Sequence, residues 1–302
     1  MIDAVLMLMR VIAILLIYVS LVSSSAIPAL QSQKGIAPKE ILIGDILTQD
    51  NRLSYGYYVL QKRQRRVRYD YPQKARSSSS LIDVSYALLT RKGRALARFD
   101  DNIYFGMGND TRFGLISVLG GSVKQVIISQ DVPRGGTQWI IDLSRRARVI
   151  YDGPRWAVGR EGDDMGVTDL DGDGVYEITV PITDFYDLQD KMSMAQIPLP
   201  EIVFKYDPRT REYLPANPLF QDYLFKGITS PADISATDEL NHRSLVLRST
   251  LTFIYAGKRQ EGWEYFDHYY KLKDESEIRR RVKSILARQP VYKFIYNHRR
   301  KY

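Results

Sequence analysis

Short runs rich in Val, Ile, Tyr and Phe, separated by turn-forming residues, follow one another from about Ile41 to Leu214. Such runs are typical of β-strands, and the Gly, Asp, Ser and Pro residues between them are typical of tight turns. Turns recur roughly every ten to twenty residues, which favours hairpins in antiparallel sheets. We therefore predict a β-rich domain over residues 38–215, built as an antiparallel sandwich or as part of a propeller.

Four pairs of these runs are close enough in sequence to form hairpins. They are 81–90 with 95–99, 113–119 with 123–129, 138–143 with 147–151, and 202–206 with 212–214. Further strands are predicted over 55–61 and over 176–180, the latter after an acidic turn. No internal repeat at the period of a propeller blade is evident in the chain, which lowers the expectation of a complete propeller.

The hydrophobic pattern becomes helical towards the C-terminus. Leu247, Leu251, Ile254 and Tyr255 are spaced as on one face of a helix, and Gly257 stands where that helix would end. Two more helices are predicted, one around 263–270 and one around 278–286, with Pro290 marking the end of the last. The sequence thus predicts a short helical bundle in a domain over 240–302, joined to the β-rich domain by a linker over 216–239.

The connection between the first two predicted helices, Tyr255–Arg259, weakly resembles that of a tetratricopeptide helix pair. One such pair cannot bury its apolar face alone. The alternative is a helical cap packed on the β-rich region, in which the aromatic residues belong to the core.

The N-terminus resembles a secretory signal. Arg10 precedes an apolar run over 11–22, and small residues lead to Ala26. Twelve helical residues span only about 18 Å, less than the roughly 30 Å core of a bilayer. We predict a signal peptide over 1–26 and export to the periplasm or the extracellular space, with an uncleaved N-terminal anchor as the alternative. Met1 and Met9 are the two candidate starts, and the absence of cysteine is compatible with an oxidising compartment.

Positive charge is concentrated in two places. The chain has a net charge of +8, and residues 274–302 hold nine Lys or Arg against three acidic residues. A second basic run lies over 62–68. Outside the cytoplasm, anionic lipid or an acidic polymer is a better partner for such clusters than nucleic acid. The alternative is a solvated helix face and a charged strand with no partner.

The segment Asp169–Glu177 carries the clearest chemical signal. It has carboxylates at its positions 1, 3, 5 and 9 and a glycine at position 6 that permits a sharp turn. Calcium takes six to eight oxygen ligands, and alternate carboxylates with a backbone carbonyl at position 7 supply them. Position 12 is Val180 rather than Glu, and the flanks are predicted as strands, so the segment is not an EF-hand. An acidic β-turn without a metal is the alternative.

This spacing resembles the calcium loops of the FG-GAP/VCBS repeat family, which occur in integrin-type β-propellers. The resemblance covers about nine residues and the strand that follows, in one copy where the family has several. It implies that the loop joins two β-strands and that calcium stabilises them. It also implies a ligand set of Asp169, Asp171, Asp173, Glu177 and the carbonyl of Val175.

Sequence motifs for catalysis are absent. The chain lacks the short motifs of serine hydrolases, zinc proteases and P-loop enzymes, and its three histidines lie far apart. The leading hypothesis is therefore an exported, non-catalytic binding or scaffold protein stabilised by calcium, with an unknown protein or glycan partner. One alternative is a surface-tethering protein that docks on anionic lipid or polymer through residues 274–302.

A hydrolase outside the cytoplasm is the other alternative, since carboxylate-based hydrolases leave little local signature. Its candidate acid and base groups are Asp163, Asp164 and Asp169, with Arg155 or Arg160 as anion-binding groups.

Overall fold

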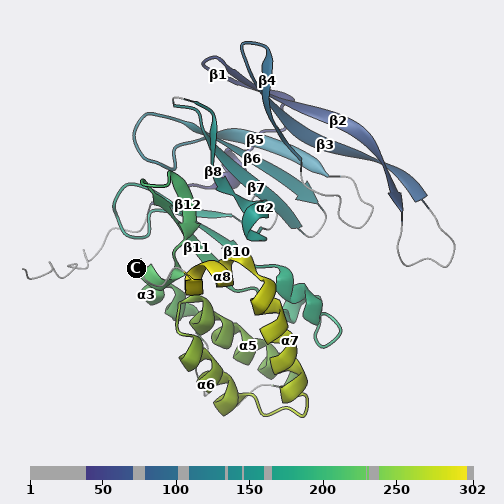
Figure 1. Cartoon of the computed structure of the whole chain (residues 1–302), viewed down its shortest axis with the longest axis vertical. Helices are drawn as coiled ribbons and strands as arrows, with labels where there is room; N and C mark the ends of the chain where they lie inside the picture. Colours follow the sequence, from purple (N-terminus) through teal and green to yellow (C-terminus); the bar gives the residue numbers. More distant parts are fainter. Residues whose placement is uncertain are drawn as a thin grey trace, which may run out of the picture. The chain divides into compact units, whose positions relative to one another are not determined.

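Three four-stranded antiparallel sheets form the β-rich part of the protein (Figure 1). The computed structural model describes residues 39–70, 79–100, 109–132, 135–144, 146–159, 165–228, 230 and 238–297. In each sheet the strands lie side by side in the order in which they follow one another in the sequence. This order is the one that short hairpin connections produce.

The strands divide evenly among the three sheets. The N-terminal sheet holds β1 (Arg52–Tyr55), β2 (Tyr58–Asp70), β3 (Ser79–Arg91) and β4 (Arg94–Phe99). The middle sheet holds β5 (Asp110–Ile116), β6 (Gln125–Val132), β7 (Gly135–Asp142) and β8 (Arg148–Asp152). The C-terminal sheet holds β9 (Gly166–Thr168), β10 (Glu177–Pro181), β11 (Glu201–Asp207) and β12 (Glu212–Pro215).

Helices are mostly C-terminal. The α-helices are α2 (Gly153–Trp156), α3 (Gln221–Leu224), α5 (Glu239–Tyr255), α6 (Arg259–Tyr269), α7 (Glu275–Arg288) and α8 (Pro290–Asn297). Short 3₁₀ helices are η1 (Ile43–Asp45), η3 (Asp184–Leu188), η4 (Met194–Gln196), η5 (Asn217–Leu219) and η6 (Phe225–Gly227). None of the helices in the described ranges is long and apolar enough to cross a membrane.

The middle sheet is buried on both faces. Successive side chains of a strand point to opposite faces. In β6, Val126 and Ile128 join a core cluster shared with the N-terminal sheet. Ile127 between them joins the largest cluster, shared with the C-terminal sheet and the helices. β6 accordingly has three consecutive apolar residues, Val126, Ile127 and Ile128, as expected where a strand is covered on both sides.

The C-terminal helices share the largest core cluster with the strands. The ring centroids of Trp156 in α2 and Phe294 in α8 lie 5.3 Å apart, edge to face. The side chain of Gln289, which is fully buried between α7 and α8, donates a hydrogen bond to the carbonyl of Trp156 at 3.1 Å. Lys39 to Asn297 therefore belong to one compact unit, which extends over Pro38–Tyr302.

The prediction of a mainly β protein with a C-terminal helical region is confirmed, and the described strands form no closed barrel. Some local details differ from the prediction. The run 55–61 is divided by a turn at Gly56, whose φ of 58° lies in the left-handed region. Pro290 ends α7 as expected but also begins α8, because proline fits the first turn of a helix.

The division into a β-rich domain over 38–215, a linker over 216–239 and a helical domain over 240–302 remains a prediction. The segment 216–239 contains η5, α3 and η6 in its described part. The predicted signal peptide over 1–26 lies outside the described residues.

The shared core predicts a single cooperative unfolding transition for residues 27–302. Replacing Gln289 by Ala removes a buried hydrogen bond and leaves the Trp156 carbonyl without this donor, which costs about 1–3 kcal/mol. We expect calorimetry to show one transition at a lower temperature. Gln260→Ala, at an exposed position of α6, is the control and should change stability by less than about 0.5 kcal/mol. A separate transition of the helices that alone responds to Gln289→Ala would contradict the shared core.

Candidate metal site

The acidic loop connects β9 to β10 at the edge of the C-terminal sheet. Thr168 pairs with Glu177 across the two strands, so the loop closes directly over an antiparallel hairpin. The flanks are strands, as predicted, and this excludes the helix-flanked geometry of an EF-hand. Two glycines with left-handed backbone, Gly172 at φ 77° and Gly174 at φ 82°, allow the chain to turn twice within the loop.

Backbone amides of the loop are held by its own carboxylates. Asp169 accepts hydrogen bonds from the N–H groups of Gly172 at 2.9 Å and Gly174 at 3.2 Å. Asp173 accepts from Val175 at 2.8 Å, and Glu177 accepts from Leu170 at 2.9 Å. A carboxylate oxygen that accepts one such bond keeps a further lone pair for a cation.

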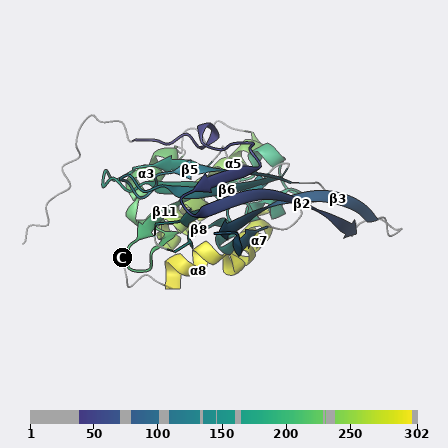
Figure 2. The ribbon, with the colours of Figure 1, turned by 90° about the horizontal axis from the view of Figure 1, so that it is seen from above.

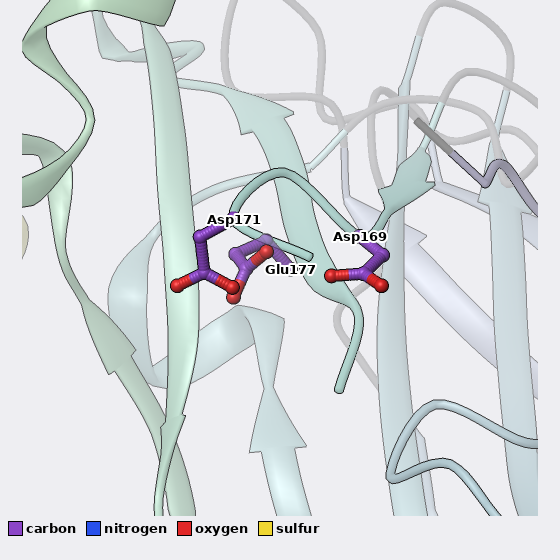
Figure 3. A group of neighbouring side chains, drawn as sticks. All are labelled: Asp169, Asp171 and Glu177. Carbon is purple, nitrogen blue, oxygen red and sulfur yellow. The ribbon is translucent and has the colours of Figure 1, made fainter. Parts of the chain in front are cut away.

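Three of the four carboxylates come together. Asp169, Asp171 and Glu177 each place one oxygen within 4.8 Å of the others. In Figure 3 the carboxylates of Asp171 and Glu177 lie close together, and that of Asp169 extends towards them from the other side of the loop. Oxygen donors alone form this group, which is the ligand type that calcium prefers.

A lysine from the neighbouring strand also reaches this group. The ammonium of Lys205 in β11 lies 2.6 Å from Asp171, 2.8 Å from Asp173 and 3.1 Å from Glu177. The register of β10 and β11 pairs Ile178 with Phe204, so Glu177 and Lys205 are the next cross-strand neighbours. The loop has four carboxylates, and Lys205 brings one positive charge to three of them. The loop therefore keeps an excess of negative charge.

The pKa shifts follow from this arrangement. Burial alone would lower the pKa of Lys205, but its hydrogen bonds to the three carboxylates outweigh burial and raise that pKa above its ordinary value. Burial raises the pKa of Glu177, and the Leu170 amide and the Lys205 ammonium offset only part of this effect. The Lys205 side chain is consequently a charged ammonium at neutral pH, and the fully buried Glu177 depends on it.

The exit of the loop is fixed by two other parts of the β-structure. The N–H of Tyr176 donates to the carbonyl of Val118 at 2.8 Å, and the hydroxyl of Tyr213 donates to the carbonyl of Tyr176 at 2.9 Å. A methyl group added at Gly120 would lie 2.6 Å from the carbonyl oxygen of Gly174. The turn between β5 and β6 thus lies against the acidic loop and needs glycine there.

The sequence-predicted ligands are distributed in two groups. Asp169, Asp171 and Glu177 converge, whereas Asp173 pairs with Lys205 and with the amide of Val175. Metal ligation by Asp173 and by the carbonyl of Val175 remains a prediction.

The residues predicted for a hydrolase are described only in part. Asp163, Asp164 and Arg160 lie outside the described residues. Arg155 pairs with Glu212 at 2.9 Å and lies over the ring of Trp156, and it shares this carboxylate with Arg148.

Lys205 is the site residue that the sequence reasoning missed. It stands within an otherwise apolar strand, Ile202–Tyr206, where a lysine needs a partner. Pairing the predicted strand 202–206 with the predicted strand 176–180 would have placed Lys205 opposite Glu177.

Comparisons with protein-family models, with curated proteins and with solved structures gave no match. The class of this protein is therefore defined by its own fold and site, as a β-rich protein with C-terminal helices and a strand-flanked acidic loop.

Removing the charge of Lys205 should lower the free energy of unfolding, because Glu177 is then a buried carboxylate without a cation. Lys205→Met leaves Glu177 with no ammonium partner, and breaking a buried pair in this way costs about 3 kcal/mol in chelator-treated protein. Urea unfolding measures the loss. Lys226→Met, at an exposed position of η6, is the matched control and should have little effect. Equal stability of the two variants would show that Glu177 does not depend on Lys205.

Proposed function

We propose that the protein is an exported, non-catalytic binding or scaffold protein whose acidic loop binds calcium. The convergence of Asp169, Asp171 and Glu177 on one point of a strand-flanked loop carries the proposal. It is supported by the all-oxygen donor set and by the negative charge that remains after Lys205 is counted.

Calcium and the Lys205 ammonium compete in this proposal for Asp171 and Glu177, the two carboxylates that both would contact. An ammonium supplies one charge and up to three hydrogen bonds, whereas calcium supplies two charges and accepts more oxygen ligands. The side chain of Lys205 is long and partly exposed, so its ammonium can move into solvent when the ion binds. Lys205 then holds the loop in its folded form while calcium is scarce.

The role of the ion in this proposal is structural. The loop fixes the turn from β9 to β10, and its exit is bound to Val118 and Tyr213, so an ion here stiffens a junction between two sheets. The partner is a protein or a glycan outside the cytoplasm.

Calcium titration of chelator-treated protein tests the site. We expect one saturable site and a gain in stability of about 2.7 kcal/mol at a hundredfold excess of calcium over its dissociation constant. Calorimetry and thermal melting measure both. Lys205→Met should bind calcium more tightly and gain more stability, because the competing ammonium is gone.

Control variants distinguish calcium binding at the acidic loop from calcium binding to exposed carboxylates elsewhere on the protein. Asp171→Asn alone keeps the loop amide bonds to Asp169 and should weaken binding at least tenfold. Replacing exposed carboxylates elsewhere, at Asp45, Asp50, Asp222 and Glu261, should leave binding unchanged. Equal calcium stabilisation of the Asp171→Asn protein and the wild type would contradict the assigned site.

Export is tested separately by the N-terminus of the mature protein. Expression with its own first 26 residues in a cell that secretes it should yield a chain starting at Ile27, measured by mass spectrometry of the secreted fraction. Replacing Ala26 with a bulky residue such as Phe should block this cleavage. An intact N-terminus on protein that stays in the cytoplasm would contradict export.

A further inference from the structure

Two tight turns of the N-terminal sheet lie against each other. The turn between β1 and β2 contains Gly56 and Tyr57, and the turn between β3 and β4 contains Lys92 and Gly93 (Figure 1). The N–H of Lys92 donates to the carbonyl of Tyr57 at 3.2 Å. The Lys92 ammonium lies 4.9 Å from the centre of the Tyr57 ring. The backbone bond fixes the two turns as one surface.

Four cations gather at these turns. Arg91 and Arg94 face each other across the β3–β4 turn, with Lys92 between them. The backbone N–H of Lys124 donates to the hydroxyl of Tyr55, so the backbone of a fourth, exposed basic residue lies beside the side chain of Tyr55 in β1. We call Tyr57, Arg91, Lys92, Arg94, Leu96 and Lys124 the turn surface.

The positive charge of the turn surface is not neutralised. Among the described residues, no carboxylate lies within ion-pair distance of its four cations. The nearest carboxylate of β3 is Asp83, eight residues from Arg91, which pairs with Arg66. Eight strand residues span about 26 Å, several times the Debye length of roughly 8 Å at physiological salt. Figure 2 shows β2 and β3 running together as a long pair towards that far end.

Two exposed apolar side chains belong to the same hairpins, one in the β1–β2 turn and one in β4. Tyr57 is 67% exposed and Leu96 is 46% exposed. Tyrosine beside lysine and arginine is the composition found at membrane interfaces, where the ring sits among the head groups and the cations meet their phosphates. A soluble polyanion offers the charge but no apolar phase for Tyr57 and Leu96.

The basic C-terminal segment differs in its pairing. Arg279 pairs with Asp267, Arg281 with Asp190, and Arg288 with Asp187. The guanidinium of Arg279 also lies over the rings of Trp263 and Phe266. Cation–π contacts occur on both surfaces, since Arg91 and Lys92 lie over the rings of Tyr58 and Tyr57. The difference is the carboxylate partners, which leave Arg279, Arg281 and Arg288 less charge to offer an external surface.

We propose that the turn surface docks on the anionic head groups of a lipid membrane. Arg91, Lys92, Arg94 and Lys124 bind head-group phosphates, and Tyr57 and Leu96 enter the interface between head groups and acyl chains. The docking is reversible and weakens with salt, because most of its free energy is electrostatic.

Sedimentation with lipid vesicles tests this proposal. The protein is residues 27–302, since Pro38–Tyr302 forms a compact unit with its own cores and the apolar run over 11–22 would itself enter lipid. We expect binding to vesicles that contain phosphatidylglycerol and not to pure phosphatidylcholine. Replacing Lys92, Arg94 and Lys124 with Gln should weaken binding roughly a hundredfold, at about fivefold per cation.

The matched control removes the same charge from the C-terminal helical region. Lys273, Arg280 and Lys293 are exposed, and replacing them with Gln should weaken binding less than about threefold. Equal losses in both triple variants would overturn the proposal, because net charge alone would then explain the binding. All six positions are on the surface, so unchanged melting temperatures confirm that the variants fold.

A second pair of measurements separates lipid from polymer. Tyr57→Ser with Leu96→Ser should weaken vesicle binding about tenfold and leave binding to dextran sulfate unchanged. Binding to dextran sulfate with no binding to anionic vesicles would overturn the proposal in favour of an acidic polymer. The calcium titration measures the acidic loop separately, so neither outcome of the lipid experiments decides whether the loop binds calcium.

Discussion

A fully buried carboxylate requires a compensating positive charge, and Glu177 is such a group at the start of β10. Lys205 supplies this charge from the adjacent strand, and it also holds Asp171 and Asp173. The conformation of the acidic loop, the junction of β9 and β10, and the competition with calcium all depend on this balance. The loop has four carboxylates and Lys205 contacts three of them. The site therefore keeps a net negative charge that attracts a divalent cation, while the ammonium allows it to fold without one.

The arrangement of the sheets positions this loop. The middle sheet is covered on both faces, so its β5–β6 turn is held firmly at the edge of the core, and this turn contacts the loop through Gly120 and Val118. The hydroxyl of Tyr213 in β12 donates to the carbonyl of Tyr176 at the exit of the loop. Stiffening the loop by a cation therefore acts on the contact between two sheets rather than on one hairpin alone. The N-terminal sheet, packed on the opposite face of the middle sheet, carries most of the turn surface, whereas Lys124 belongs to the β5–β6 turn itself.

Local sequence patterns were sufficient to predict most strands and three of the C-terminal helices, because alternation, turn residues and helical spacing are local signals. The acidic loop was predictable for the same reason, since its carboxylates and glycines lie within nine residues. Lys205 was not found because it is 28 residues from Glu177 and becomes a neighbour only through the β10–β11 register. The three-residue strand β9 is too short to show a period. The stacking of the sheets depends on contacts distant in sequence, which composition cannot give.

The central claim is that calcium and the Lys205 ammonium occupy the same group of carboxylates in turn. A crystal structure of residues 27–302 grown with excess calcium tests it most directly. The account predicts an ion with oxygen ligands at about 2.3–2.6 Å, including Asp169, Asp171 and Glu177, and a Lys205 side chain displaced from Asp171. Lys205 still bonded to Asp171, Asp173 and Glu177, with no ion in the loop at saturating calcium, would contradict it.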